Sequence, residues 1–266
     1  MMRLMTWLFL VFSILILAAG SIHAETGIQS IEADSLMSVE ENAYKLSQVV
    51  VESEVDSLMS AKWGDNFKHV SYPTQWLDRV FTVKPGDSIQ SAIDAANSAG
   101  GGVVLLKEGI HTIDSGITLK SRVTIIGEGR ARTILTQGSD MSGTVFNADP
   151  SSQVTDLVIK DLTLKGSQSG KAYGIQMAGK NGSRHTRIML QNVTVSHWSA
   201  HGVHMKRTDN IIMDNCNFQF NGSTGSLFHN VYFLYNKHIL QSDCDMSFPV
   251  TGKGNKYTST EYSNPN

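Results

Sequence analysis

The chain has 266 residues and a net charge of −2 at pH 7, and 17% of its residues are charged. This near-neutral balance gives no electrostatic case for a nucleic-acid partner. Its two cysteines cannot build a disulfide scaffold. The 23 glycines and the moderate polarity are more typical of a repetitive β-structure than of a helical bundle.

Residues 1–24 are predicted to be a secretory signal peptide. Arg3 precedes an apolar run from Trp7 to Ala19, and small residues then lead to a cleavage point after Ala24, with Gly20 as a rival site. The apolar run is short for a membrane span. We therefore expect a secreted or periplasmic protein with no stable membrane span after cleavage.

Residues 25–80 are predicted to form an N-terminal arm or cap with a short helix. Apolar side chains at helical spacing, followed by three aromatic ones, indicate that the arm packs on something: Ala43, Leu46, Val50, Leu58, Trp63, Phe67 and Trp76. Residues 81–266 are predicted to be one repetitive domain.

A helix is predicted over residues 89–98. Asp87 or Ser88 can accept hydrogen bonds from the amides of its first turn. One apolar stripe follows the helical period: Ile89, Ala92, Ile93 and Ala96. The glycines at 100–102 end the helix where a positive φ is needed, and a hydrophobic strand follows at residues 103–106.

Four later segments share one pattern, in which strand alternation slips by one residue at a central polar pair. They are LVIKDLTL (157–164), IMLQNVTV (188–195), IIMDNCNF (211–218) and ILQSDCDM (239–246). A slip that keeps both halves facing inward requires a corner. The slip falls on Asp or Asn, which tolerate the left-handed backbone region. Each segment is therefore predicted to be two short strands joined by a tight bend.

A further strand recurs at 28-residue intervals, starting at Gly174, Gly202 and Asn230, with Gly254 a candidate for the next. Such a recurrence indicates a solenoid with one coil per repeat. Three strands per coil predict an all-β fold, a single-stranded right-handed parallel β-helix with an N-terminal capping helix. Helical repeats are the rival, but slipping segments rich in Asn and Thr disfavour helices.

This register predicts two inward columns: Leu162, Val193, Cys216 and Cys244, then Leu164, Val195, Phe218 and Met246. Secretion would allow a disulfide between the two cysteines. The alternative is a pair of buried thiols that act as small hydrophobic side chains. Stacked parallel strands hold the Cβ vectors parallel rather than converging, which favours the thiols.

The stretches VKPGDSIQSAIDAANSAGGGVVLLKEGIHTI and LKSRVTIIGEGRARTIL, followed by the coil segments, resemble the pectin-lyase-like superfamily of right-handed parallel β-helix proteins. The resemblance covers roughly residues 80–260. Within the superfamily, the N-terminal part is most similar to mannuronan C5-epimerases and related uronate lyases. The resemblance implies a helix that plugs the N-terminal end of the coil and a polysaccharide groove along one outer face.

The segment SGKAYG (169–174) is similar to the epimerase segment with a catalytic Lys and Asp. Lys171 matches that lysine, and Tyr173 stands where the family has Asp. The epimerase motif Tyr-Gly-Phe-Asp-Pro-His aligns with HGVHMK (201–206), where only the glycine is shared. Apart from Lys171, the epimerase machinery is therefore not carried over.

Strand alternation sends Val203 and Met205 inward, so His204 and Lys206 face outward. The same logic predicts one outer face rich in His, Lys and Tyr. Its members are Tyr173, Gln176, His201, His204, Lys206, His229, Tyr232 and Lys256, with Arg207 directed sideways at a turn. By contrast, His185 and Arg187 are predicted to lie in a solvated loop.

That mix of side chains suits proton removal next to a carboxylate. Lys206 or Arg207 could neutralise the uronate carboxylate, and His204 or His201 could remove the C5 proton. Tyr232 or Tyr173 could donate a proton. The catalytic candidates are His204, Lys206, Tyr232, His201 and Lys171, and the substrate-binding candidates are Tyr173, Gln176, Arg207, His229 and Lys256.

The sequence therefore favours an acidic polysaccharide as partner, alginate before pectin, with β-elimination or C5-epimerisation as the chemistry. A binding protein without turnover, a structural β-helix and a merely solvated His ladder stay open. Hydrolysis or a calcium site would need clustered carboxylates on the same face. Only Asp243 with Asp245, on another face, offers a weak calcium candidate, so no cofactor is expected.

The C-terminal end of the coil needs a cover. The polar tail after Thr258 could fold over it, another chain could cover it, or the chain could be a shortened form. The oligomeric state stays open.

Overall fold

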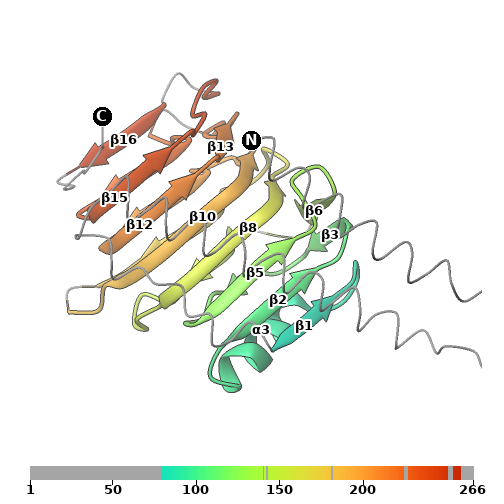
Figure 1. The fold of residues 1–266 in the computed structure, drawn as a ribbon. Helices are drawn as coiled ribbons and strands as arrows, with labels where there is room; N and C mark the ends of the chain where they lie inside the picture. Colours follow the sequence, from blue (N-terminus) through green and yellow to red (C-terminus); the bar gives the residue numbers. More distant parts are fainter. Residues whose placement is uncertain are drawn as a thin grey trace, which may run out of the picture. The chain divides into compact units, whose positions relative to one another are not determined.

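The described chain winds as a ladder of parallel strands that climbs from β1 to β16 (Figure 1). The computed structural model describes residues 79–139, 141, 143–180, 182–224, 227–250 and 254–258. Every pairing between the named strands is parallel. The predicted parallel β-helix is confirmed for this part of the chain.

In the described residues, one sheet has ten strands and runs in the order β1-β2-β5-β8-β10-β12-β15, with β3, β6 and β13 paired beside this path. We call it the ten-stranded sheet. Its strands are β1 Val80–Val83, β2 Gly102–Leu106, β3 Gly109–Ile113, β5 Val123–Gly127, β6 Thr133–Gln137, β8 Thr155–Lys165, β10 His185–Ser196, β12 Thr208–Asp214, β13 Asn217–Gln219 and β15 Lys237–Ser242.

The second sheet has six strands in the described residues, in the order β16-β14-β11-β9-β7-β4. We call it the six-stranded sheet. Its strands are β4 Ile117–Thr118, β7 Gly143–Ala148, β9 Ala172–Ala178, β11 Val203–Lys206, β14 Val231–Leu234 and β16 Asn255–Thr258. β9, β11 and β14 recur at the predicted interval, and β16 at Asn255–Thr258 is the next strand in the stack.

Helix α3 spans Ile89–Ser98, as predicted. The Ser88 side chain accepts a hydrogen bond from the Ser91 amide. Ser88 is therefore the N-cap residue, for which the sequence left Asp87 and Ser88 as candidates. Ile89, Ile93 and Ala96 are buried and join the core inside the coil. The role of α3 as a plug for the end of the coil stays a prediction.

The corners predicted at the four alternation slips are confirmed. Asp161, Asn192, Asn215 and Asp243 have φ values of 57°, 51°, 50° and 49°, all in the left-handed region. The side chains also bond along the stack, because Asn192 Nδ2 donates to Asp161 Oδ1 at 2.6 Å. Asn215 Nδ2 in turn donates to Asn192 Oδ1 at 3.3 Å.

The solvated loop predicted around His185 and Arg187 is wrong. His185 begins β10 and is fully buried, and its Nδ1 accepts from the Val154 amide at 3.1 Å. Arg187 occupies a second left-handed corner, with φ 57°, and forms a two-point ion pair with Asp156. Asp156 and Asn210 occupy the same corner in the neighbouring coils, with φ values of 58° and 52°, so this corner also carries Asp and Asn and the prediction overlooked them.

The inward columns follow the predicted register. Val193 pairs with Leu162, and Val195 pairs with both Leu164 and Phe218. Cys216 is buried, Cys244 is half-buried, and both are free thiols. Burial, with the neighbouring Cys244 thiol, raises the pKa of Cys216 well above its usual value. The interpretation as stacked thiols is therefore consistent with the structure.

The predicted signal peptide, the arm up to residue 78 and the tail beyond Thr258 lie outside the described residues. Among the residues that are described, no helix has the length and apolar character needed to cross a membrane.

Candidate functional site

The outer face of the six-stranded sheet carries one column of polar side chains across four successive coils. Gln176, His204, Tyr232 and Lys256 are in register on β9, β11, β14 and β16. The alternation that places them outward is visible in β11, where Val203 and Met205 are fully buried. The column predicted from the repeat spacing is confirmed residue by residue.

Around this column, six rings gather, which we call the ring cluster: Tyr173, His201, His204, Phe228, His229 and Tyr232. His204 and Tyr232 stack with their centroids 5.2 Å apart and their planes 7° apart. The Tyr173 ring also stacks with His204, with the two ring centroids 6.3 Å apart. Other ring pairs of the cluster are tilted or edge-on, with interplanar angles up to 90°. We call the partly apolar surface that these rings form the platform.

Two histidines of the ring cluster lie inside it rather than on its surface. His201 and His229 are 5% and 7% exposed, and their rings stack 5.3 Å apart. His201 Nδ1 accepts from the His229 amide at 3.0 Å, so the proton of the neutral ring lies on Nε2. We interpret these two side chains as supports of the platform, which weakens the catalytic candidacy of His201.

Burial lowers the pKa of two imidazoles of the ring cluster, those of His201 and His204. It lowers the pKa of His201 to about 3, helped by the nearby His204 and His229. It also lowers the pKa of His204 to about 4, helped by the charge of Lys206. Burial raises the pKa of Tyr173, whose hydroxyl therefore stays protonated. At neutral pH the site offers uncharged rings beside lysine cations.

A short hydrogen-bond chain orients His204. The Thr144 hydroxyl donates to Gln176 Oε1 at 3.0 Å, and Gln176 Nε2 lies 3.4 Å from His204 Nδ1. If the amide donates to Nδ1, the ring proton lies on Nε2. That Nε2 is buried and has no hydrogen-bond partner in the structure. In this tautomer, His204 carries one N–H group that is buried and has no partner.

Lysines stand at the rim of the ring cluster. Lys171 is exposed, with Nζ 5.6 Å from the Phe228 centroid, and Lys256 Nζ lies 5.7 Å from the Tyr232 centroid. Lys206 is half-buried and outward on β11, two residues after His204. Phe228 was not predicted, because it lies in the irregular segment before β14 and carries no repeat signal.

Arg207 is not part of the ring cluster. It occupies the corner after β11, with φ 50°, and its guanidinium lies 5.1 Å from the Tyr235 centroid. This agrees with the predicted sideways direction at a turn. Its predicted role in binding substrate therefore lacks support from its position.

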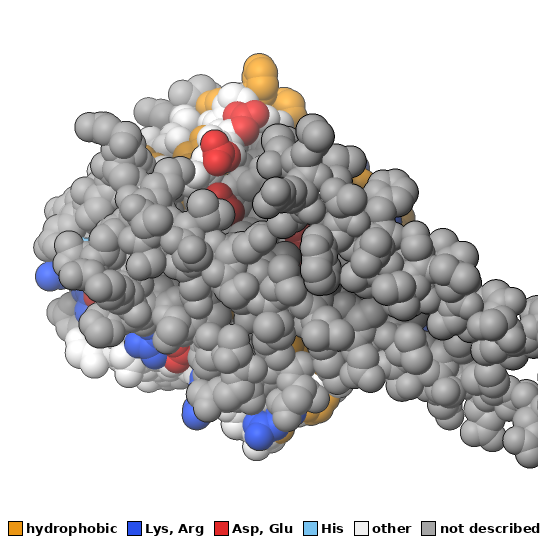
Figure 2. Space-filling view, viewed as in Figure 1, with side chains coloured by type: hydrophobic (Ala, Val, Ile, Leu, Met, Phe, Trp, Pro, Cys, Tyr) orange, Lys and Arg blue, Asp and Glu red, His pale blue; other side chains and the backbone are white. Residues whose placement is uncertain are grey.

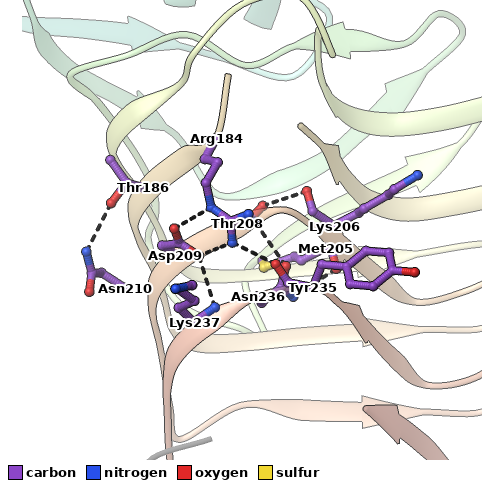
Figure 3. A network of polar contacts seen from close by, with 10 residues as sticks. All are labelled: Arg184, Thr186, Met205, Lys206, Thr208, Asp209, Asn210, Tyr235, Asn236 and Lys237. Atoms are coloured by element: carbon purple, nitrogen blue, oxygen red, sulfur yellow. Dashed lines mark hydrogen bonds and ion pairs between the residues drawn. The ribbon is translucent and has the colours of Figure 1, made fainter. Parts of the chain in front are cut away.

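A polar network fixes the chain just beyond Lys206 (Figure 3). The Asp209 carboxylate accepts two hydrogen bonds from Arg184 and one from the Lys237 amide at 2.9 Å. The buried Asn236 accepts from the Thr208 amide and donates to the Met205 carbonyl, both at 2.9 Å. These bonds tie three coils together at one corner, so they hold the end of β11 in place.

No group of three His, Cys, Asp or Glu side chains in the described residues is arranged to hold a metal ion.

No family model matches the chain. The chain is 36% identical over 126 residues to alginate lyase 7 of Azotobacter vinelandii, a match that covers 41% of this chain and 14% of the lyase. It is 33% identical over 132 residues to mannuronan C5-epimerase AlgE5 of the same organism, covering 43% and 13% of the two chains. The resemblance drawn from the sequence motifs is confirmed.

The matched part spans about one seventh of these relatives, so their whole activities are not transferred by the match. Among solved structures, the ORF18 protein of Geobacillus virus E2 superposes with a TM-score of 0.50 at 17% identity. That superposition covers 69% of this chain and 40% of the viral chain, and it supports the fold alone.

Proposed function

We propose that the outer face of the six-stranded sheet binds a uronic-acid polymer and removes the C5 proton of a bound uronate. The observation that carries the proposal is the stacking of His204 on Tyr232 within a platform rimmed by Lys171, Lys206 and Lys256. Two sequence relatives are named for alginate lysis and mannuronan epimerisation. Because both named reactions begin with loss of the C5 proton, alginate is the first polymer to test.

Proton removal next to a carboxylate needs three contributions. Lys206 neutralises the carboxylate and the charge that develops on it. His204 and Tyr232 are assigned as the acid–base pair. In a lyase, the C5 proton goes to the base, the C4–O4 bond breaks, a C4–C5 double bond forms and the acid protonates the departing O4. In an epimerase, a proton returns to C5 from the other ring face.

The direction of proton transfer depends on the His204 tautomer. With Gln176 donating to Nδ1, His204 offers its Nε2–H to a substrate oxygen, and Tyr232 then takes the role of base. With the opposite tautomer, Nε2 accepts the C5 proton and Tyr232 donates. The geometry favours the first assignment, whereas the sequence pattern had favoured His204 as base.

A second candidate, carbohydrate binding without turnover, is favoured by two observations. His204 Nε2 is buried, and the His204 pKa of about 4 is low for a base that works at neutral pH. In this alternative the ring cluster is a stacking platform, and the lysines attract the carboxylates. The protein is proposed to work outside the cytoplasm in either case.

The deciding experiment follows absorbance near 235 nm while the full chain is mixed with alginate, polymannuronate or pectate, with and without calcium. Rising absorbance reports unsaturated uronate ends and therefore a lyase. In parallel, NMR in D2O follows exchange of the C5 proton, which an epimerase causes without new absorbance. If both signals stay flat while a binding isotherm is measurable, turnover is refuted and the binding candidate stands.

Variants assign the activity to this face. His204→Ala should lower the rate at least 100-fold, because a general acid or base contributes 10²–10⁴-fold. His238→Ala, which alters an exposed histidine on β15, is the matched control and should leave the rate unchanged. Equal losses in both variants would remove the ring cluster from the mechanism.

Gln176→Glu tests the tautomer. A carboxylate at this position accepts from Nδ1–H, leaves a lone pair on Nε2 and raises the His204 pKa. If His204 works as a donor through Nε2–H, the rate falls. A higher rate, with a pH profile that moves upward, would assign the role of base to His204.

A further inference from the structure

The ten-stranded sheet has an apolar outer face. Seven outward side chains alternate along their strands with residues of the inner core, and we call them the outer stripe. They are Val103, Leu105, Ile126, Val158, Met189, Ile212 and Leu240. Four of these align in register across β8, β10, β12 and β15. None of the seven belongs to the core cluster inside the coil.

The outer stripe is shielded from water, since its members are only 1–8% exposed. The inner core does not explain this, because Ile159, Leu190 and Met213 point the other way from the same strands. Helix α3, the one helix of the described chain, packs its apolar side on the inner core. A contiguous apolar face of this kind marks a contact surface.

We propose that residues 25–78 of this chain dock on the outer stripe. This segment leads through Arg79 directly into β1, which is the first strand of the same sheet. Its 54 residues are more than long enough. Crossing seven strands about 4.8 Å apart requires roughly 30 Å, which about 20 helical residues span.

The composition of the segment fits an apolar surface. It carries Ala43, Leu46, Val50 and Leu58 at helical spacing and then three aromatic side chains, so it has an apolar side to bury. Burying such side chains contributes about 25 cal/mol for each Å² removed from water. A polar linker would lack this pattern.

Charge also favours this occupant. Residues 25–78 contain ten acidic and three basic side chains, whereas residues 79–266 contain 14 acidic and 18 basic ones. In Figure 2, Lys and Arg side chains are spaced along the left and lower edges of the described surface. Lys160, in register with Ile126 of the outer stripe, is 9% exposed, faces outward from β8 and already pairs with Asp161 at 3.6 Å. An acidic segment suits this surface better than a basic one.

Docking here leaves the candidate site open, because the ring cluster lies on the six-stranded sheet. The inference is therefore independent of the proposed function, and neither depends on the outcome of the other. It also assigns the segment a structural role, which is to complete the outside of the coil.

Hydrogen exchange of the full chain, read by mass spectrometry, tests the proposal. In the unmodified protein, peptides from residues 25–78 and from β10 and β12 should exchange slowly. Ile212→Asp places a charge in the centre of the outer stripe and should speed exchange in residues 25–78 at least tenfold. Peptides from β9 and β11 should not change. Thr194→Asp, outward on β10 beyond the corner at Asn192, is the matched control and should leave the segment protected.

Ile212→Ala, which adds no charge, covers the case in which Ile212→Asp fails to fold. It should speed exchange in residues 25–78 more than in the coil strands. Exchange of residues 25–78 at the unprotected rate in the unmodified chain would overturn the proposal. Light scattering provides the other decisive outcome. A dimer that Ile212→Asp converts to a monomer would make a second copy the occupant and would also overturn it.

Discussion

The two sheets of the coil bury similar inner faces and differ in their outer faces. The outer face of the six-stranded sheet shows Gln176, His204 and Tyr232, with lysines at the rim. The outer face of the ten-stranded sheet shows the outer stripe, where apolar side chains stand at the equivalent outward positions. One backbone frame thus carries a polar ring platform on one side and an apolar surface on another.

This difference separates two roles of outward residues. Inward positions must be apolar for the coil to fold, so they carry no information about function. Outward positions are free of that demand. Rings and cations on one sheet therefore indicate chemistry or ligand binding, whereas apolar residues on the other indicate a protein contact.

The largest test compares alanine substitutions on the two outer faces with one in the core. Leu190→Ala should lower the free energy of unfolding by about 2–5 kcal/mol. Met189→Ala, on the outer stripe, should lower the free energy of unfolding by a similar amount, because the Met189 side chain is only 4% exposed. Gln176→Ala should cost less than about 1 kcal/mol. Urea titration measures all three, and a Met189→Ala cost no greater than that of Gln176→Ala would break the comparison.

Acid should weaken the protein through its buried histidines. The pKa values of His185 and His204 are about 4, below the ordinary 6.5. The unfolded chain therefore binds more protons between these values, so stability falls as pH drops from 6.5 towards 4 and is full above 6.5. Each histidine contributes at most on the order of 3 kcal/mol. The urea midpoint at pH 7.5 and pH 5 measures the loss.

Two variants apportion this acid sensitivity between the sheets. His204→Gln, on the six-stranded sheet, should flatten the pH dependence, since it removes one buried titrating group. His185→Gln, on the ten-stranded sheet, should flatten it as well, since the His185 pKa is also about 4. Identical pH dependence in all three proteins would refute the assignment.

A corner substitution tests the frame that both sheets share. Asn192 has φ 51° and bonds to the stacked Asp161. Asn192→Ala should lower the free energy of unfolding by about 1–2 kcal/mol. A Cβ is disfavoured in the left-handed region, and the side-chain hydrogen bond to Asp161 is lost. Asn192→Gly should cost less, since glycine has no Cβ. A larger loss with glycine than with alanine in thermal unfolding would contradict the conformational explanation.

The smallest expected effect concerns the rim of the ring cluster. Lys256→Gln should weaken polyuronate binding about threefold at low salt, and the difference should vanish in 0.5 M salt. Lys165→Gln, at an exposed position on β8, is the matched control. An equal effect of the two variants would mean that charge in general, and not this rim, attracts the polymer.

Regular features of the coil were predictable, and irregular ones were not. The recurrence that begins at Gly174 predicted the register of Gln176, His204 and Tyr232, because steps of 28 residues place them on the same strand face, and Lys256 follows after a step of 24. The corners at Asp161 and its equivalents were predictable because Asp and Asn report the left-handed region. The corner at Arg187 was missed because arginine has no preference for the left-handed region, although Asp156 and Asn210 occupy the same corner in the neighbouring coils.

Burial within the candidate site escaped prediction for a similar reason. His201 and His229 stand just before their strands, where alternation does not specify direction. Phe228 and the neighbouring rings cover them, and these neighbours come from other coils or from an irregular segment. Which imidazole stays accessible is therefore a property of packing between coils.

The amino-acid sequence by itself determined the repeat, the helix α3, the Asp and Asn corners and the list of side chains that face outward. These depend on backbone geometry within a few residues, which residue type and spacing report directly. Only the tertiary structure decided that His201 is buried, that His204 stacks on Tyr232 with a pKa of about 4, and that the outer stripe is shielded. Burial and pKa depend on neighbours from other coils, and a pattern along one strand does not contain them.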